Sequence, residues 1–345
     1  MLYVGLDLSR KRLDFDARRG GGEVFERGAV PPDRDGLSGL VERLGDAEPV
    51  LAVIESMSGA RFVHDQLELH GWQVRIADAA KARGLAPLAC KTDKIDCWVL
   101  AELARLDLVP EIWLPDPSVR AERERARFRL HLVKHRSSLK NRVHAILFQH
   151  GVPSPTSDLF GVGGRRLLER LKLPEPWAAT LAASLSLIDT LDEQIHGCER
   201  ELRQLGADHP YIPLLESCPG IGWILGYTIA AEIGEIGRFA SPRKLVGYTG
   251  LCPRVEQSGE RDRRGPLRKN GPHYLRWALI EAAHTAGRHP HYQPIVERMR
   301  ARHGKKRGSK IAAIEIARRQ TEAIWHMLST GQPFAPAGAT DPLAA

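Results

Sequence analysis

Three strands in succession are predicted by the opening run LYVGLDLSRKRLDFDARRGGGEVFERGAV, residues 2–30. Residues 2–9 and 12–19 have the composition of strands, the three glycines at 20–22 predict a hairpin turn, and residues 23–30 pair back. The chain is therefore expected to begin with an antiparallel meander.

Helices and strands alternate after this meander. Helices are predicted at 33–44 and 60–70, and strands at 50–56 (VLAVIES is the buried type) and in the run WQVRIAD at 72–78. A further helix begins in KTDKIDCWVLAEL, residues 91–103. A meander followed by alternating helices and strands is the layout of the ribonuclease-H-like fold, so residues 1–115 are expected to form an α/β domain of this kind.

Long helices are predicted beyond residue 116. Nine basic residues lie between Arg120 and Arg142, among apolar residues at helical spacing, and a Gly/Pro-rich break follows at 152–164. From residue 181 apolar residues recur in steps of three and four, as in a coiled-coil seam. Residues 116–208 are therefore expected to form a helical, coiled-coil segment whose helices pack on each other or on another protomer. A mainly α C-terminal domain at 209–331 and a disordered tail at 332–345 complete the predicted organisation.

The charge of the chain is distributed unevenly. The formal net charge is +8, but residues 254–319 contain 17 basic and 6 acidic residues, a local excess of +11. Such a segment suits a polyanion such as nucleic acid. The five cysteines form no CxxC pair, which argues against a zinc knuckle or a disulfide framework. No run approaches the roughly 20 apolar residues of a membrane span, so a cytoplasmic protein without a membrane partner is expected.

Four carboxylates are candidates for one site. Asp7 ends the first strand, Glu55 ends the fourth, and Asp93 and Asp96 lie three residues apart at the start of the next helix. Residues three apart share a helix face, and the first and fourth strands are neighbours in this fold, so the four side chains are expected to converge. Such a cluster needs hard divalent cations, typically Mg²⁺, and two metal ions would serve phosphodiester cleavage. Taken singly, an aspartate here is as well explained as a turn former or a helix cap.

Ser258 is a candidate nucleophile in a predicted polar loop. The loop continues through Gly259 to the cations Arg261, Arg263, Arg264, Arg268 and Lys269. A serine hydroxyl needs a base or metal ion to activate it and cations to stabilise the charge that develops. An ordinary solvated serine is the alternative interpretation of these residues.

Two further motifs are candidates for nucleic-acid contact. PGIG, with Gly220 and Gly222, resembles a helix-hairpin-helix turn, in which backbone N–H groups approach a phosphate. A simple helix-packing turn explains it as well. The basic run RMRARHGKKRGSK at 298–310 contains Lys305, Lys306 and Arg307 and is either a nucleic-acid contact or a solvated basic face.

The order and spacing of these motifs resemble the DEDD transposases of the IS-one-ten insertion-sequence family, relatives of the Piv invertases. The resemblance rests on GLDLSRKRLD, VIES, KTDKIDCWVLAEL and the stretch from ESCPGIG to LIEAA, and it covers most of the chain. It implies a RuvC-like domain whose acidic tetrad is Asp7, Glu55, Asp93 and Asp96. It also implies a C-terminal transposase domain in which Ser258 is the nucleophile of an [EQ]SG motif. Cys97 departs from the family pattern, where Ala is frequent.

The resemblance also implies a function. Such enzymes cut and rejoin double-stranded DNA, donor and target, through a covalent 5′-phosphoserine, with tetrad and serine supplied by different protomers of at least a dimer. A structured noncoding RNA from the element pairs with both DNAs. Two other functions stay open: a RuvC-like junction endonuclease that hydrolyses with water, and a nucleic-acid-binding regulator with a degenerate nuclease fold.

Overall fold

The computed structural model describes residues 1–45, 48–85, 93–153, 156, 158–258, 261–268 and 270–336. The chain divides into two compact units, Met1–Pro115 and Asp116–Ala345. The second unit contains both the predicted helical segment at 116–208 and the predicted domain at 209–331. Across the described ranges, no helix combines the length and apolar character needed to cross a bilayer.

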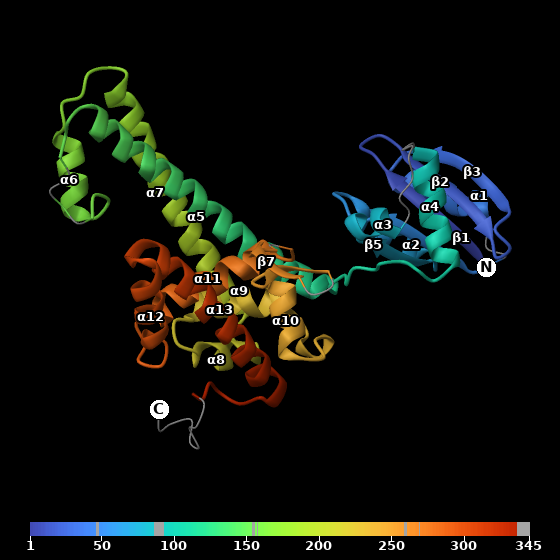
Figure 1. Ribbon diagram of the computed structural model, residues 1–345. Helices are drawn as coiled ribbons and strands as arrows, with labels where there is room; N and C mark the ends of the chain where they lie inside the picture. The colour runs from blue at the N-terminus through green and yellow to red at the C-terminus, as the bar shows by residue number, and fades with distance from the viewer. Residues whose placement is uncertain are drawn as a thin grey trace. The chain divides into compact units, whose positions relative to one another are not determined.

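A five-stranded mixed sheet forms the centre of the first unit (Figure 1). Its strands are β1 (Leu2–Leu8), β2 (Leu13–Arg19), β3 (Val24–Val30), β4 (Val50–Glu55) and β5 (Gln73–Ala77), in the order β3-β2-β1-β4-β5. The predicted meander is present as antiparallel β1-β2-β3, and β4 pairs in parallel with β1 and β5. This mixed α/β unit is compatible with the expected ribonuclease-H-like domain.

Helices cover both faces of this sheet. They are α1 (Arg34–Leu44), α2 (Ala60–Leu69) and α4 (Asp93–Arg105), and the short helix α3 (Ala79–Leu85) follows β5. The side chain of Asp33 starts α1 by accepting a hydrogen bond from the Gly36 amide at 2.8 Å. Residues of α1 and α2 pack with the even-numbered residues of β1 and β4, whereas Leu100 and Ala104 of α4 pack with odd-numbered residues of β4. The alternation along each strand therefore decides which side chains face α4.

The second unit is mainly helical. Its elements are α5 (Pro117–Gln149), α6 (Val162–Arg170), α7 (Trp177–Leu205), α8 (Tyr211–Glu216), α9 (Trp223–Ile233), the 3-10 helix η1 (Ile236–Arg238), α10 (Pro242–Thr249), β6 (Pro253–Ser258), β7 (Arg261–Leu267), α11 (His273–Ala286), α12 (Gln293–His303) and α13 (Lys305–Thr330). Helices α8 to α11 and α13 share one core. The predicted tail at 332–345 begins in contact with this unit, since the amide of Phe334 donates to the Ser217 hydroxyl at 2.8 Å; residues 337–345 lie outside the described residues.

Helices α5 and α7 lie side by side along most of their length (Figure 1). Their apolar seam includes Val143, Ile146 and Ile188, so the prediction that these helices pack on each other is confirmed. Ion pairs line the seam: Arg125–Glu201, Arg129–Glu199 and Arg136–Asp192. Several of the basic residues between Arg120 and Arg142 therefore join two helices of the same unit.

Two arginines one turn apart on α5 hold the C-terminal end of α9. Arg123, 8 % exposed, donates to the carbonyl oxygens of Ala231 at 2.8 Å and Glu232 at 2.6 Å. Arg127 donates to both carboxylate oxygens of Glu232, at 2.7 and 3.0 Å, and the Glu232 side chain is fully buried. The carbonyls at a helix end lack intrahelical partners and carry the negative end of the dipole, so Arg123 stabilises this end.

Arg127→Met is expected to lower the free energy of unfolding of the protein by about 3 kcal/mol, because it leaves the Glu232 carboxylate buried without its partner. Arg125→Met is the matched control on the same helix. Its ion pair with Glu201 is exposed, so it should cost at most about 1 kcal/mol. Urea unfolding followed by circular dichroism measures both, and equal losses would contradict this assignment.

Candidate active site

Asp7 and Glu55 end neighbouring parallel strands on the same face of the sheet. The last paired positions of β1 and β4 are Leu6 and Ile54, so Asp7 and Glu55 are the next residues in register. Residues in register on parallel strands point to the same face. Val53, two positions before Glu55, packs in the cluster that contains α4 residues. Asp7 and Glu55 therefore lie at the carboxyl edge of the face that α4 covers.

The first turns of α4 lie directly against β1 because Gly5 has no side chain. A Cβ at Gly5 would be 1.8 Å from the carbonyl oxygen of Cys97 and 2.7 Å from the amide nitrogen of Ala101. Asp96 is the residue before Cys97, and Asp7 is two positions beyond Gly5 along β1. The close approach thus brings the beginning of α4, with Asp96, to the edge where Asp7 and Glu55 lie.

Cys97 is a buried side chain of α4. Its thiol is buried, and burial and then the charge of Asp7 raise the pKa of the thiol. Cys97 is therefore a neutral, buried side chain. Its small size suits the contact between α4 and β1, which accounts for a cysteine at this position.

Gly5→Ala is expected to lower the free energy of unfolding by about 1–3 kcal/mol and to displace α4 from β1, because the new methyl group overlaps the backbone of Cys97. Gly39→Ala is the control. Gly39 lies within α1, where a Cβ meets no atom within 4 Å, so this change should stabilise the protein by about 0.5–1 kcal/mol. Urea unfolding of both variants tests the contact, and a Gly5→Ala protein as stable as the parent would contradict it.

Asp14 lies directly across from Asp7 in the β1-β2 pair, on the face that α4 covers. Asp14 is 9 % exposed and Asp16, on the same strand, is 2 % exposed. Arg12 donates from Nε to the Asp14 carboxylate at 2.8 Å and from Nη2 at 2.7 Å, and Asp16 accepts from Arg18 and Arg27. The alternation with buried Leu13 and Phe15 was the signal that could have placed Asp14 here. The guanidinium of Arg12 compensates the charge of this carboxylate.

The carboxylates at this edge have the chemistry of a hard-cation site. Asp7, Glu55 and Asp96 offer carboxylate oxygens, the ligands that Mg²⁺ and Ca²⁺ prefer. Among the side chains that the structure describes, no group of three or more His, Cys, Asp or Glu is close enough to hold a metal ion. The backbone of Asp93 opens α4, but its side chain lies outside the described residues. The donor types therefore fit a hard divalent cation, and the convergence of all four predicted carboxylates stays a prediction.

Ser258 is the last residue of strand β6 and pairs with Arg261 of β7 in an antiparallel hairpin. The polar loop predicted at Ser258 and the cations that follow it is therefore, over the described residues 253–258 and 261–267, a β-hairpin. Aspartate, glycine and proline are depleted in strands, so the composition of β7 did not indicate a hairpin. Arg263 and Arg268 are exposed; the side chains of Ser258, Arg261 and Arg264, and all of Gly259 and Lys269, lie outside the described residues.

The other predicted contact residues lie on the second unit. Gly220 has φ +83°, and a Cβ there would be 2.3 Å from the Ala282 carbonyl oxygen of α11. This glycine therefore has a packing role, as the alternative interpretation of PGIG required. Gly222 caps α9 and faces open space. Lys305, Lys306 and Arg307 form the exposed first turn of α13.

Two family models match the chain. A DEDD transposase model of the IS110 type matches residues 4–151, which include all four predicted carboxylates. The model described as Transposase IS116/IS110/IS902 family matches residues 212–297, which include Ser258. The two matches lie in the same order as the motifs and together span both units.

Individual relatives extend the match along the chain. The transposase for insertion sequence element IS1328 of Yersinia enterocolitica is 25 % identical over 96 % of this chain and 98 % of its own length. The insertion element IS116 uncharacterized 44.8 kDa protein of Streptomyces clavuligerus is 31 % identical over 43 % of this chain and 36 % of its own length. The transposase for insertion sequence element IS1111A of Coxiella burnetii is 25 % identical over 59 % of this chain and 57 % of its own length.

Proposed function

Because the chain carries both domains of the IS116/IS110/IS902 transposase family, we propose that it cuts and rejoins DNA by transesterification, with Ser258 as the nucleophile. The observation that carries this proposal is the position of Asp7 and Glu55 at the ends of neighbouring parallel strands, on the face covered by α4. A carboxylate site of this kind serves phosphodiester chemistry.

The proposed role of Asp7, Glu55, Asp93 and Asp96 is to bind Mg²⁺, as a two-metal site. Carboxylates that share one edge repel one another until a cation compensates their charge. When bound, the cations would offset charge on the scissile phosphate and stabilise the leaving oxygen.

The proposed reaction is an exchange of one phosphodiester for another. The Oγ of Ser258 forms a bond to phosphorus and loses its proton, while the bond from phosphorus to the 3′ oxygen breaks and leaves a 3′-hydroxyl. The 5′ end remains on the serine. Attack by a 3′-hydroxyl of another strand reverses the step, restores the serine and seals the DNA without ATP. The exposed guanidinium groups of Arg263 and Arg268 on and beside the hairpin support an anionic substrate here.

The proposed partners are donor and target DNA, a structured noncoding guide RNA, and a second copy of the chain that completes the site. The resemblance supports the RNA and the composite site, and the basic segment at 254–319 supports a polyanion. The exposed residues Lys305, Lys306 and Arg307 are assigned to phosphate contacts.

A recombination assay with purified protein tests the proposal. A donor plasmid carrying the element ends is mixed with a target plasmid, Mg²⁺ and RNA transcribed from the noncoding flank. Joined molecules are expected only when protein, Mg²⁺ and RNA are all present. If the plasmids were joined without the RNA, the proposed guide role of the RNA would be wrong. Cleavage without any joining would favour the junction endonuclease.

A further inference from the structure

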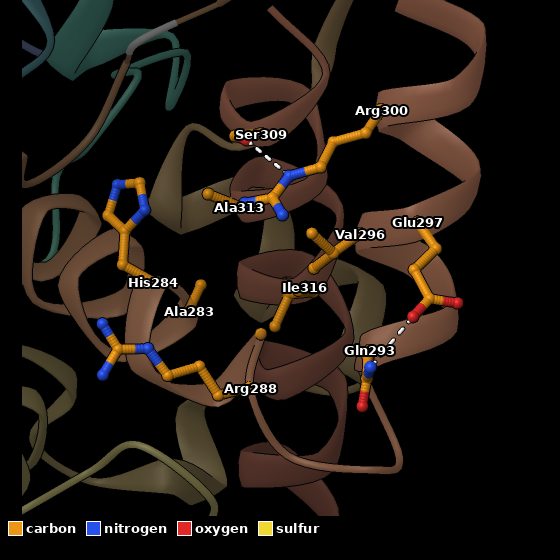
Figure 2. Close-up of a pocket in the computed structure, with 11 residues that line it drawn as sticks. Ala283, His284, Arg288, Gln293, Val296, Glu297, Arg300, Ser309, Ala313 and Ile316 are labelled. Atoms are coloured by element: carbon orange, nitrogen blue, oxygen red, sulfur yellow. Dashed lines mark hydrogen bonds between the residues drawn. The ribbon is translucent and has the colours of Figure 1, made fainter. Parts of the chain in front are cut away.

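A cavity of about 560 Å³ lies between helices α11, α12 and α13 (Figure 2). It is separate from Ser258 and from the carboxylates in sequence and in lining. Its residues are Ala283, His284, Gly287, Arg288, Gln293, Val296, Glu297, Arg300, Ser309, Ala313 and Ile316. Its volume falls within the range of small-molecule sites in proteins, about 300–1,000 Å³.

Two glycines shape this cavity. A Cβ at Gly308 would be 2.3 Å from the Met299 carbonyl oxygen, so its absence lets the start of α13 approach the end of α12. This approach brings Ser309 to Arg300, whose Nε donates to the serine hydroxyl at 2.9 Å. A Cβ at Gly287 would be 3.1 Å from Val296, so a larger residue there would fill the floor.

Positive charge dominates the polar part of the cavity. Arg300 extends from α12 across the cavity, and the bond to Ser309 orients its guanidinium (Figure 2). In the part of the chain that the structure describes, neither Arg288 nor Arg300 forms an ion pair with a carboxylate. Glu297, the one acid of the lining, accepts a hydrogen bond from Gln293 and lies on the opposite side from His284 and Arg288 in this view. The guanidinium of Arg300 is thus available to an anion, and that of Arg288 points away from it in this view.

The floor of the cavity is apolar. Ala283, Ala313 and Ile316 are buried side chains, and Val296 is half-buried beside them. A phosphate alone gains no favourable contact from an apolar surface, and the cavity is larger than a phosphate. A flat, apolar group with an attached anion matches both halves of the lining. A nucleotide has this composition, since its base faces are apolar and its phosphate is charged.

We propose that this cavity binds one unpaired nucleotide of a nucleic-acid strand, with its phosphate on Arg300 and its base against the half-buried side chain of Val296. This inference rests on the proposed function only in taking nucleic acid as the ligand. A base stacked and paired within a duplex cannot enter a cavity, so the ligand is single-stranded. The basic run at 298–310 borders the cavity on α12 and α13 and guides the adjoining phosphates.

Fluorescence anisotropy of short labelled oligonucleotides tests the proposal on the full chain. One sequence is used as single-stranded DNA, single-stranded RNA and blunt DNA duplex, at fixed salt. Arg300→Gln is expected to weaken binding of the single strand by about tenfold, because it removes a charge-assisted phosphate contact. Arg300→Lys retains the charge and should recover part of the loss. The arm that loses more affinity, DNA or RNA, identifies which strand occupies the cavity.

A second variant tests the base rather than the phosphate. Ala313→Met fills the floor with a flexible apolar side chain and leaves both arginines in place, so a nucleotide site should lose affinity for the single strand while duplex binding stays unchanged. Arg243→Gln is the charge-matched control, since Arg243 is exposed on α10 and does not line the cavity. Thermal unfolding shows whether each variant is folded.

The outcomes separate this inference from the proposed function. If Arg300→Gln weakened binding of the single strand and of the duplex equally, the inference would be overturned. The same would follow if Arg243→Gln weakened single-strand binding as much as Arg300→Gln does, because the cavity would then be part of a general basic surface. Unchanged single-strand binding in a folded Ala313→Met protein would also overturn it. Neither result affects strand joining by Ser258, which is measured in the recombination assay with the parent protein.

Discussion

Asp7→Asn will reduce DNA strand cleavage by more than about a hundredfold while leaving the protein folded. The substitution keeps the shape of the side chain and removes the negative charge that a hard cation requires. Asp7 lies at the end of β1, so its loss leaves the buried strand positions unchanged. Glu55→Gln, in the next position in register on β4, is expected to have the same effect. Cleavage of a labelled donor DNA in Mg²⁺ measures both variants.

Asp14→Asn is the matched control for this prediction. Asp14 is the cross-strand neighbour of Asp7 on the same face, but Arg12 holds its carboxylate. Its variant is expected to retain cleavage with reduced stability. If Asp14→Asn lost cleavage while Asp7→Asn retained it, the assignment of ligands at this edge would be wrong.

Ser258→Ala is expected to abolish both recombination and the covalent link between protein and DNA. In the proposed reaction the 5′ end of the cut strand stays on the Ser258 oxygen, and alanine has no oxygen to accept it. A denaturing gel of the parent protein with a labelled strand should show a band shifted by the mass of one chain. The variant should bind DNA and RNA with unchanged affinity, since all the cations of 261–269 remain.

A mixture of two inactive variants extends this test to the proposed composite site. If Ser258 of one protomer acts with the tetrad of another, Ser258→Ala and Asp7→Asn chains mixed before assembly should recover part of the activity. Each inactive variant alone is the control. If Ser258→Ala cleaved DNA at the parent rate and left a free 5′-phosphate, the assignment of Ser258 as the nucleophile would be wrong. Such a result would favour a hydrolytic junction endonuclease.

Apart from α3, the strands and helices of the first unit were predictable because their patterns are local. Alternation along β1 and β2, the glycine turn between β2 and β3, and the cap at Asp33 are each set by neighbouring residues. The hairpin formed by β6 and β7 was missed. Its strands pair through their backbones, for example at Ser258 and Arg261, and the charged composition of these residues does not predict strands. Helix α3 was missed because it is short, and its seven residues carry one buried side chain.

Some features of the candidate site were also predictable from the sequence, and others required the tertiary structure. Residue types and spacing were enough to single out Asp7, Glu55 and Asp96, because carboxylates at strand ends and at a helix start have few other uses in combination. The role of Gly5 depended on tertiary contact, since only the packed structure shows the Cys97 carbonyl where a Cβ would lie. The ion pair of Asp14 with Arg12 also became visible only in the folded structure.

Local pattern, charge and motif order were sufficient to identify an α/β unit with an acidic edge and a basic helical region. Those properties depend on residues near one another in the chain, so they can be predicted from the sequence. The junction of α5 with α9 through Arg127 and Glu232, and the cavity between α11, α12 and α13, appear only on folding. Each joins side chains from separate helices, and the free energy of burying a charge or leaving a cavity depends on that three-dimensional surrounding.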